Sequence, residues 1–265
     1  MSAMDNSANF ESDRGAEARE VVTTETSSIA LAEPAAFACE LPSPAKPDAR
    51  AVAGESLVKE YHTNIGTRRV LDGISFEVRA GEKLAVIGRN GSGKTTLVKL
   101  LGGVEQPTAG AIRRELFMSW PLGFSGGVEG AMTGAASARF IARLYGRDEN
   151  DIIAFVDDFA ELGRQLYIPI EAYSSGMRMR LQFALTLAIN FECFLIDEVI
   201  SVGDQRFQKK CHDSLFVQRS HCAMILVSHD IHVIREYCDR ALVLKAGRGK
   251  VFEDLELALE IYATP

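Results

Sequence analysis

Hydrophobic and polar positions along the chain predict a series of strands. Residues 74–78 alternate between the two kinds, as expected for a strand with one buried face, and 56–61 predicts a strand before it. After a turn at 80–82, residues 83–87 form a short apolar run typical of a strand buried in a parallel sheet. Further buried strands are expected at 193–196 and 223–227, and a closing hairpin at 241–245 and 249–252.

Helical patterns occupy much of the chain between these strands. They are expected at 95–101, 135–145, 149–162 and 175–189, with a last helix from Asp254. Glycines and prolines throughout 119–134 predict a loop there. Strands that alternate with helices indicate an α/β fold with a mostly parallel core sheet. The mostly helical run at about 115–180 predicts a separate helical subdomain.

The first 54 residues differ in composition from the rest. They are rich in Ala, Ser, Glu and Pro and poor in aromatic residues, which predicts a disordered acidic extension before a folded domain at 55–265. Of the chain's net charge of −7, residues 1–50 carry −5, with nine acidic and four basic side chains. The folded part therefore gives no sign of nucleic-acid binding.

Cysteine usage and hydropathy indicate the compartment. An odd number of cysteines, five, with no CxxC pair argues against a disulfide framework and favours a reducing, cytoplasmic environment. The N-terminus lacks the basic and apolar regions of a secretory signal. The longest apolar region, 181–196, is interrupted by polar residues and is too polar to span a bilayer. Work at a membrane would require a partner that crosses it.

A phosphate-binding loop follows the strand at 83–87. Its sequence GRNGSGKT matches the pattern G-x-x-x-x-G-K-[ST], in which glycines let backbone N–H groups turn inward around phosphates. Lys94 is expected to reach the β- and γ-phosphates, and the Thr95 hydroxyl to bind Mg²⁺. The nucleotide-binding candidates here are Gly88, Arg89, Asn90, Gly91, Ser92, Gly93, Lys94, Thr95 and Thr96.

Two later strands end in residues suited to phosphate chemistry. Asp197 follows an apolar strand and is a candidate Mg²⁺ ligand, with Glu198 beside it as the general base that polarises the attacking water. Taken alone, this acidic pair would fit a helix N-terminus better. His229 follows the strand at 223–227, where it could contact a γ-phosphate, although a lone histidine is more often a cap or packing residue.

Two further features could complete a nucleotide site. Tyr61 ends the first predicted strand and could stack on adenine, although packing is the simpler role. A Ser-Ser-Gly turn opens the helix at 175–189, and Ser174 and Gly176 could offer a second phosphate cradle. Because the chain already has one phosphate loop, a second cradle suggests a site shared between two chains.

In this order, the motifs resemble the nucleotide-binding subunit of an ABC transporter, over about four fifths of the chain. The resemblance assigns Tyr61 to the aromatic loop, 88–96 to Walker A, 173–177 to the signature, 194–197 to Walker B, Glu198 to the catalytic base, 201–204 with Asp204 to the D-loop, and His229 to the switch. It implies a P-loop NTPase fold of ABC type, with an antiparallel β portion beside the parallel core. It also implies a homodimer of subunits paired head to tail, each ATP lying between the Walker A loop of one and the signature of the other.

The residues within these motifs are similar to those of the polysaccharide-exporting branch of that family. The signature is YSSGM, and Asp197 and Glu198 are followed by VISVGD. The segment SWPLGF at 119–124 looks closest to capsular exporters, and the end at Pro265 leaves no room for the carbohydrate-binding module that O-antigen exporters often carry. One departure is that no glutamine occupies the usual Q-loop position near Ser119.

We therefore expect an ATP- and Mg²⁺-dependent hydrolase that powers export of a capsular-type polysaccharide. It would act peripherally on the cytoplasmic face of the inner membrane, with an integral membrane permease carrying the polymer. The alternatives are an O-antigen or teichoic-acid exporter ATPase, a soluble ABC ATPase without a permease, and a phosphate-loop kinase. A soluble ABC ATPase of the ribosome usually has two such domains, and one of DNA repair has coiled-coil insertions, and this chain has neither.

Overall fold

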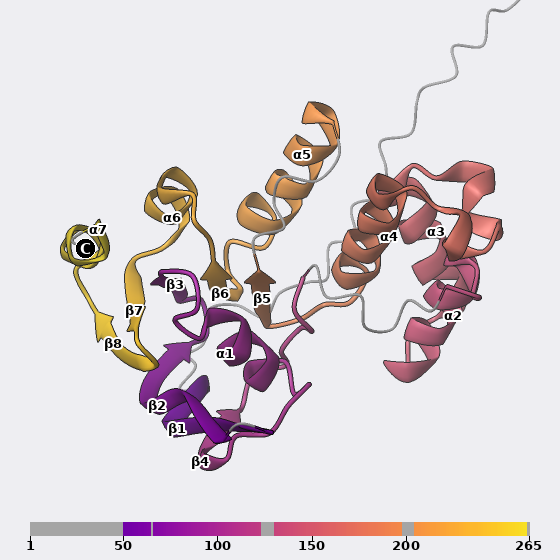
Figure 1. The fold of residues 1–265 in the computed structure, drawn as a ribbon. Coiled ribbons are helices and arrows are strands. Elements are labelled where there is room, and N and C mark those ends of the chain that lie inside the picture. The colour runs from indigo at the N-terminus through magenta and orange to yellow at the C-terminus, as the bar shows by residue number, and fades with distance from the viewer. Residues whose placement is uncertain (1–49, 65, 123–129, 198–203, 264–265) are drawn as a thin grey trace, which may run out of the picture. The chain divides into compact units, whose positions relative to one another are not determined.

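Two β-sheets form the centre of the computed structural model, which describes residues 50–64, 66–122, 130–197 and 204–263. The smaller sheet is antiparallel, in the order β2-β1-β4 (Figure 1). It consists of β1 (Ala51–Thr63), β2 (Gly66–Arg79) and β4 (Ala109–Arg114). This is the antiparallel β portion that the resemblance implies.

The larger sheet has the order β5-β6-β3-β7-β8, and its first four strands are parallel. These strands are β3 (Lys83–Gly88), β5 (Cys193–Asp197), β6 (Ala223–Val227), β7 (Arg240–Lys245) and the antiparallel edge strand β8 (Arg248–Phe252). All five residues of β6 are buried, as expected for the middle of a parallel sheet that is covered on both faces. The α/β fold with a mostly parallel core is confirmed.

Helices connect and cover the strands. They are α1 (Lys94–Leu101), α2 (Gly134–Leu144), α3 (Glu149–Ala160), α4 (Ser175–Leu187), α5 (Gln205–His212), α6 (Ile231–Tyr237) and α7 (Leu255–Ala263), with short turns η1 (Gly163–Tyr167), η2 (Ile170–Ala172) and η3 (Asp213–Val217). Side chains cap several N-termini by accepting backbone N–H groups, as Asp148 does for α3 and Asp230 for α6. Among the described residues, no helix is both long and apolar enough to cross a bilayer.

The folded region begins earlier than the sequence indicated. β1 starts at Ala51, and Ala51, Val52, Ala53 and Gly54 are buried and paired with β2. The expectation that 51–54 belong to a disordered extension is therefore wrong, because small residues without an alternating pattern lie at the centre of a three-stranded sheet. Residues 1–49 of the expected extension lie outside the described part.

The expected helical subdomain also has different limits. Residues 117–122 run parallel to β5, with bridges from Met118 to Cys193 and from Leu122 to Ile196, so this segment extends the core sheet. The helices of the region start with α2 at Gly134, and α4 continues to Leu187. The boundary at about 115 is thus corrected to the start of α2, and the one at 180 to the end of α4.

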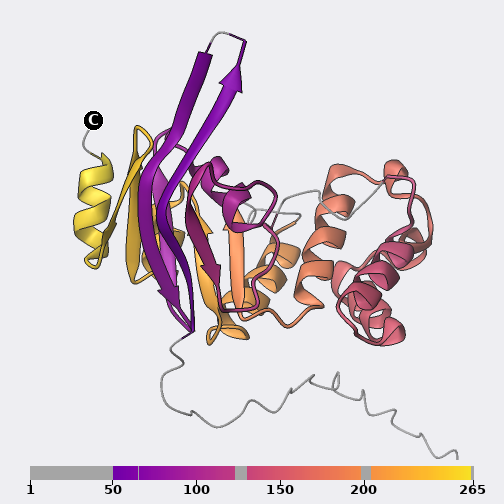
Figure 2. The ribbon, with the colours of Figure 1, turned by 90° about the horizontal axis from the view of Figure 1, so that it is seen from below.

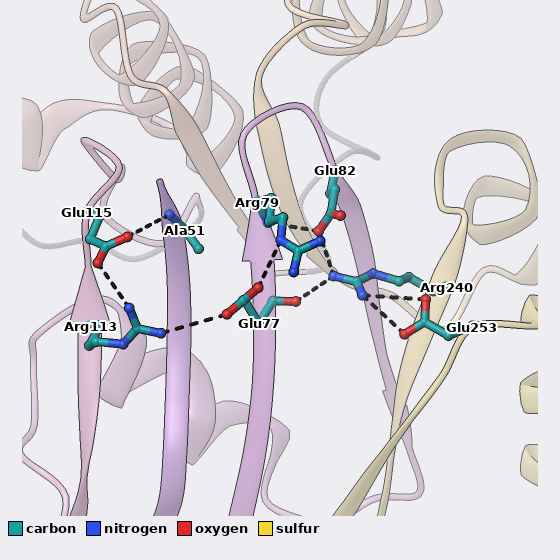
Figure 3. A network of polar contacts seen from close by, with 8 residues as sticks. All are labelled: Ala51, Glu77, Arg79, Glu82, Arg113, Glu115, Arg240 and Glu253. Atoms are coloured by element: carbon teal, nitrogen blue, oxygen red, sulfur yellow. Dashed lines mark hydrogen bonds and ion pairs between the residues drawn. The ribbon is translucent and has the colours of Figure 1, made fainter. Parts of the chain in front are cut away.

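Charged side chains join the two sheets at one end (Figure 3). Arg240 of β7, whose side chain is only 18% exposed, pairs with Glu82 at 2.6 Å and with Glu253 at 3.2 Å, and donates to the carbonyl of Glu77. From β4, Arg113 reaches the Glu77 carboxylate at 3.7 Å. A mostly buried arginine with several acceptors fixes orientation more than it adds stability, so we expect this network to fix how β2 lies against β7.

Candidate nucleotide-binding site

The phosphate loop connects the end of β3 to the start of α1 (Figure 1). Gly91 and Gly93 have φ angles of 79° and 109°, values that residues with side chains rarely adopt. A Cβ at Gly88 would lie 2.5 Å from Ser92 Oγ and 2.6 Å from the Leu244 carbonyl oxygen. The glycines are therefore required by backbone conformation and by close approach, as the motif predicts.

Two polar side chains lie within this loop. Lys94 Nζ donates to the carbonyl oxygens of Gly88 at 2.5 Å and Arg89 at 3.4 Å, so its ammonium lies over the loop. Ser92 is only 5% exposed, and within the described residues its hydroxyl has no hydrogen-bond partner. A buried hydroxyl without a partner is costly unless a ligand satisfies it. An ammonium and an unsatisfied hydroxyl inside one backbone loop fit a phosphate group.

The strand order brings the phosphate loop, Asp197 and His229 to one edge of the larger sheet. β6 lies between β3 and β5, and Val227 of β6 is in register with Val86 of β3 and Asp197 of β5. Adjacent strands are about 4.8 Å apart, so Asp197 and the phosphate loop face each other across the end of β6. His229 follows that end directly, between them in strand order.

A pocket of about 490 Å³ opens at this edge. It is lined by Arg89 and Asn90 of the phosphate loop, by His229, and by Tyr262 of α7. Sequence reasoning missed Tyr262, because a tyrosine in a short C-terminal helix matches no motif. Its spacing from the apolar residues Ala258 and Leu259 was the only signal.

The first turn of α1 places Thr95 at the surface and Thr96 half-buried. The described residues contain no cluster of three or more His, Cys, Asp or Glu that could hold a metal ion. Mg²⁺ in nucleotide sites needs only one or two carboxylates together with substrate phosphates. A threonine hydroxyl at the loop and the Asp197 carboxylate across the sheet edge fit that donor set.

Tyr61 of β1 has partners within the chain. Its hydroxyl donates to Glu105 at 2.7 Å, and Lys59 Nζ lies 5.1 Å from the centre of its ring. The Tyr61 hydrogen bond, aided by Lys59 and Lys99, lowers the pKa of the Glu105 carboxyl. These contacts fix the orientation of the ring, and its stacking on adenine stays a prediction.

The signature residues begin α4. Ser174 caps this helix by accepting the Met177 N–H at 3.2 Å. Among the described residues, a Cβ at Gly176 would approach only Ser174 Oγ, at 4.0 Å. Tyr173 is buried, and its hydroxyl donates to the Gln165 carbonyl at 2.6 Å, so it anchors the turn. Neither Ser174 nor Gly176 lines the pocket beside Asn90.

Asp204 connects two helices. It caps α5 by accepting the Phe207 N–H at 2.9 Å, and it pairs at 2.7 Å with Arg180 of α4, whose guanidinium lies over the Phe207 ring. The Phe207 hydrogen bond and Arg180 lower the pKa of the Asp204 carboxyl. The residue expected in the D-loop thus ties α5 to the helix that carries the signature. Glu198, the expected base, lies outside the described residues.

Ser119, near the position expected for a Q-loop glutamine, has a different role. It is 2% exposed, and its hydroxyl accepts the Leu195 N–H of β5 at 3.0 Å. Its side chain is therefore committed to the edge of the sheet.

Known proteins resemble this chain in sequence and in fold. A family model described as "ABC transporter" matches residues 71–201. The capsule polysaccharide export ATP-binding protein CtrD of Neisseria meningitidis is 49% identical, over 80% of this chain and 98% of that protein. The teichoic acids export ATP-binding protein TagH of Staphylococcus haemolyticus is 35% identical, over 72% of this chain and 74% of that protein.

Among solved structures, similarity extends to the dimeric, post-hydrolysis ATP-binding cassette MJ0796 bound to ADP and Pi. The TM-score is 0.65 at 20% identity, over 76% of this chain and 97% of that one, which shows the shared P-loop fold. The resemblance inferred from the motifs is confirmed. The chain belongs to the ABC transporter family, as an ATP-binding protein more similar to a capsule polysaccharide exporter than to a teichoic acid exporter.

Proposed function

We propose that this chain hydrolyses ATP to power the export of a capsular-type polysaccharide across the inner membrane. The observation that carries the ATP site is the edge of the larger sheet, where the phosphate loop, His229 and Asp197 converge. The capsular substrate is supported by the 49% identity to CtrD over nearly that protein's whole length. The teichoic-acid alternative is less favoured, because TagH is only 35% identical.

The loop residues bind and orient the triphosphate. Lys94 exchanges the carbonyls of Gly88 and Arg89 for β- and γ-phosphate oxygens, and Ser92 gains an acceptor for its buried hydroxyl. Thr95 and Asp197 would hold Mg²⁺, which when bound neutralises phosphate charge. Glu198 accepts a proton from the attacking water, and His229 donates to the terminal phosphate.

A homodimer would complete the site. Ser174 and Gly176 lie at the uncrowded start of α4 but not in the pocket beside Asn90, which supports their use on the ATP of a second copy. Asp204 would hold the D-loop through Arg180. The resulting assembly is head to tail, with two equivalent ATP sites.

An integral membrane permease is the further partner that this function needs, and it would hold the ATPase at the cytoplasmic face. An aromatic cluster of Phe117, Trp120, Tyr145 and Phe191 supports a contact site beside the 117–122 segment. Phe117 is 42% exposed, and Phe140 of α2, nearby in sequence, is 48% exposed. Exposed aromatic residues are typical of protein interfaces.

The test measures ATP hydrolysis by the full chain, alone and with its permease, in Lys94→Ala and Glu198→Gln variants. We expect Lys94→Ala to lose ATP binding, and Glu198→Gln to bind ATP but lose at least about a hundredfold in turnover. Wild-type turnover by Glu198→Gln would refute the base assignment.

The alternatives give different results in the same preparations. A phosphate-loop kinase would transfer phosphate to a small acceptor rather than to water. A soluble ABC ATPase would copurify with ribosomes or DNA instead of a membrane protein. Co-isolation of a permease whose loss stops export of a capsular polymer would support the proposal.

A further inference from the structure

The pocket at the phosphate loop has a lining suited to an anion. Arg89 brings a permanent positive charge, Asn90 an amide, His229 an imidazole and Tyr262 a phenol, and each side chain has an N–H or O–H that can donate a hydrogen bond. The volume of about 490 Å³ is within the range of small-molecule sites. Three of these residues already belong to the proposed ATP site, and Tyr262 is the addition.

The apolar face of α7 brings Tyr262 to this place. Ala258 and Leu259 are buried, and Tyr262 follows them by four and three residues, which puts all three on one face of the helix. The Tyr262 ring is half-buried and packs against the core beside β7 and β8, next to which α7 lies in Figures 1 and 2. The side chain thus packs on the core and also borders the pocket.

A charged clamp connects α7 to the helix that follows His229. Arg235 of α6 donates two hydrogen bonds to the Glu256 carboxylate of α7, at 2.8 Å and 2.7 Å. Such bidentate pairs fix geometry as well as adding energy. Because Asp230 caps α6 immediately after His229, the clamp relates the positions of His229 and Tyr262.

The Tyr262 hydroxyl has donor capacity to spare. Within the part of the chain that the structure describes, it forms no hydrogen bond, whereas the hydroxyls of Tyr61 and Tyr173 each have a protein acceptor. An uncommitted phenol beside a guanidinium and an imidazole is a good donor to a phosphate oxygen.

We propose that Tyr262 is a nucleotide-contacting residue that donates its hydroxyl to the terminal phosphate of ATP, from the same chain that supplies the phosphate loop. This inference rests on the proposed ATP site and adds α7 to it. The C-terminal helix then contributes to the preference for ATP over ADP, even in a single chain that has not yet paired with a second one.

The test compares Tyr262→Phe, which keeps the packed ring and removes only the hydroxyl, with the wild type in the full chain. Displacement of a fluorescent nucleotide gives the Kd of ATP and of ADP at protein concentrations where the chain is monomeric. Ile261→Ala is the matched control, since Ile261 is 40% exposed on the same helix and does not line the pocket. Circular dichroism of each variant checks that α7 is still folded.

We expect Tyr262→Phe to weaken ATP about fivefold or more and to leave ADP unchanged, with Ile261→Ala like the wild type. Unchanged ATP affinity, or an equal loss for ATP and ADP, would overturn the contact. A loss seen only in ATP-driven self-association would overturn it in favour of a contact between chains. Failure of the ATP site itself looks different, because wild type and Lys94→Ala would then bind ATP equally poorly.

Discussion

The Ser119→Ala substitution tests whether one buried hydroxyl holds the edge of the larger sheet. The 117–122 segment lies parallel to β5, but Pro121 has no N–H, and Leu122 donates to the Leu195 carbonyl instead at 2.8 Å. The Leu195 N–H in turn donates a hydrogen bond to Ser119 Oγ at 3.0 Å. Removing that oxygen leaves a buried donor without an acceptor.

The expected cost follows from that loss. A buried N–H left without a partner destabilises by about 1–3 kcal/mol. For a domain of this size, each kcal/mol shifts Tm by about 2–4 °C, so Ser119→Ala should lower Tm by roughly 2–12 °C. Urea unfolding should show a lower midpoint with an unchanged m-value, because the same surface becomes exposed.

The chain offers a matched control in Ser137 of α2. It is also buried, at 0% exposure, but within the described residues its hydroxyl has no hydrogen-bond partner. Ser137→Ala makes the same chemical change and should be neutral or stabilising, since it removes a desolvated polar group. Equal destabilisation by both substitutions would refute the reasoning, because loss of a hydroxyl alone would then account for the cost.

Three further predictions concern the loop, a helix cap and the thiols. Gly88→Ala should weaken ATP binding by more than about tenfold in a nucleotide titration, because its Cβ would meet the Leu244 carbonyl at 2.6 Å, and normal binding would contradict the steric argument. Gly146→Ala, at a φ of 62° and with no described atom near its Cβ, should cost only about 1 kcal/mol of stability in urea unfolding. Because the pKa of Asp204 is lowered, its charge stabilises the fold above the unfolded pKa of about 3.9, and this contribution disappears as pH falls through the folded pKa. Asp204→Asn should therefore be less stable than wild type at pH 7, and the difference in unfolding free energy should shrink in acid, whereas a difference that grows in acid would contradict the argument. Burial raises the pKa of Cys193, Cys211 and Cys238 to about 12 and that of Cys222 to about 11. In a Cys39→Ser background these thiols should therefore resist iodoacetamide at pH 8 until the chain is unfolded, and rapid labelling of the native protein would contradict their burial.

Features of the fold could be predicted where their physical requirements lie within a few neighbouring residues of the sequence. The phosphate loop was predictable because its glycines are demanded by backbone angles and close contacts within a few residues. β4 was missed because its six residues include only Ile112 as a large apolar residue, and that side chain is merely half-buried. α5 and α6 are short, and a few caps and apolar positions give too little pattern to distinguish them from loops.

What the sequence left open at the site depends on tertiary contacts. Tyr262 is distant in sequence from the loop whose pocket it lines, so only the packing of α7 on β7 and β8 reveals the association. Ser119 lies near the position expected for the Q-loop glutamine, but its hydroxyl accepts the Leu195 N–H. Asp204 was assigned by resemblance to the D-loop, and the structure adds its bond to Arg180, which no spacing rule indicates.

The position of β6 between β3 and β5 limits how far the sheet can move at the end that carries His229. Its five residues are buried and hydrogen-bonded on both sides, so shifting the strand would break two ladders at once. The turn after β6 has local hydrogen bonds instead: the Asp230 N–H donates to Ser228 Oγ, and the Asp230 carboxylate caps α6. If His229 contacts a phosphate as we propose, its displacement on loss of that phosphate would be expected to pass along α6 and through Arg235 to Glu256 of α7, while the sheet stays in place.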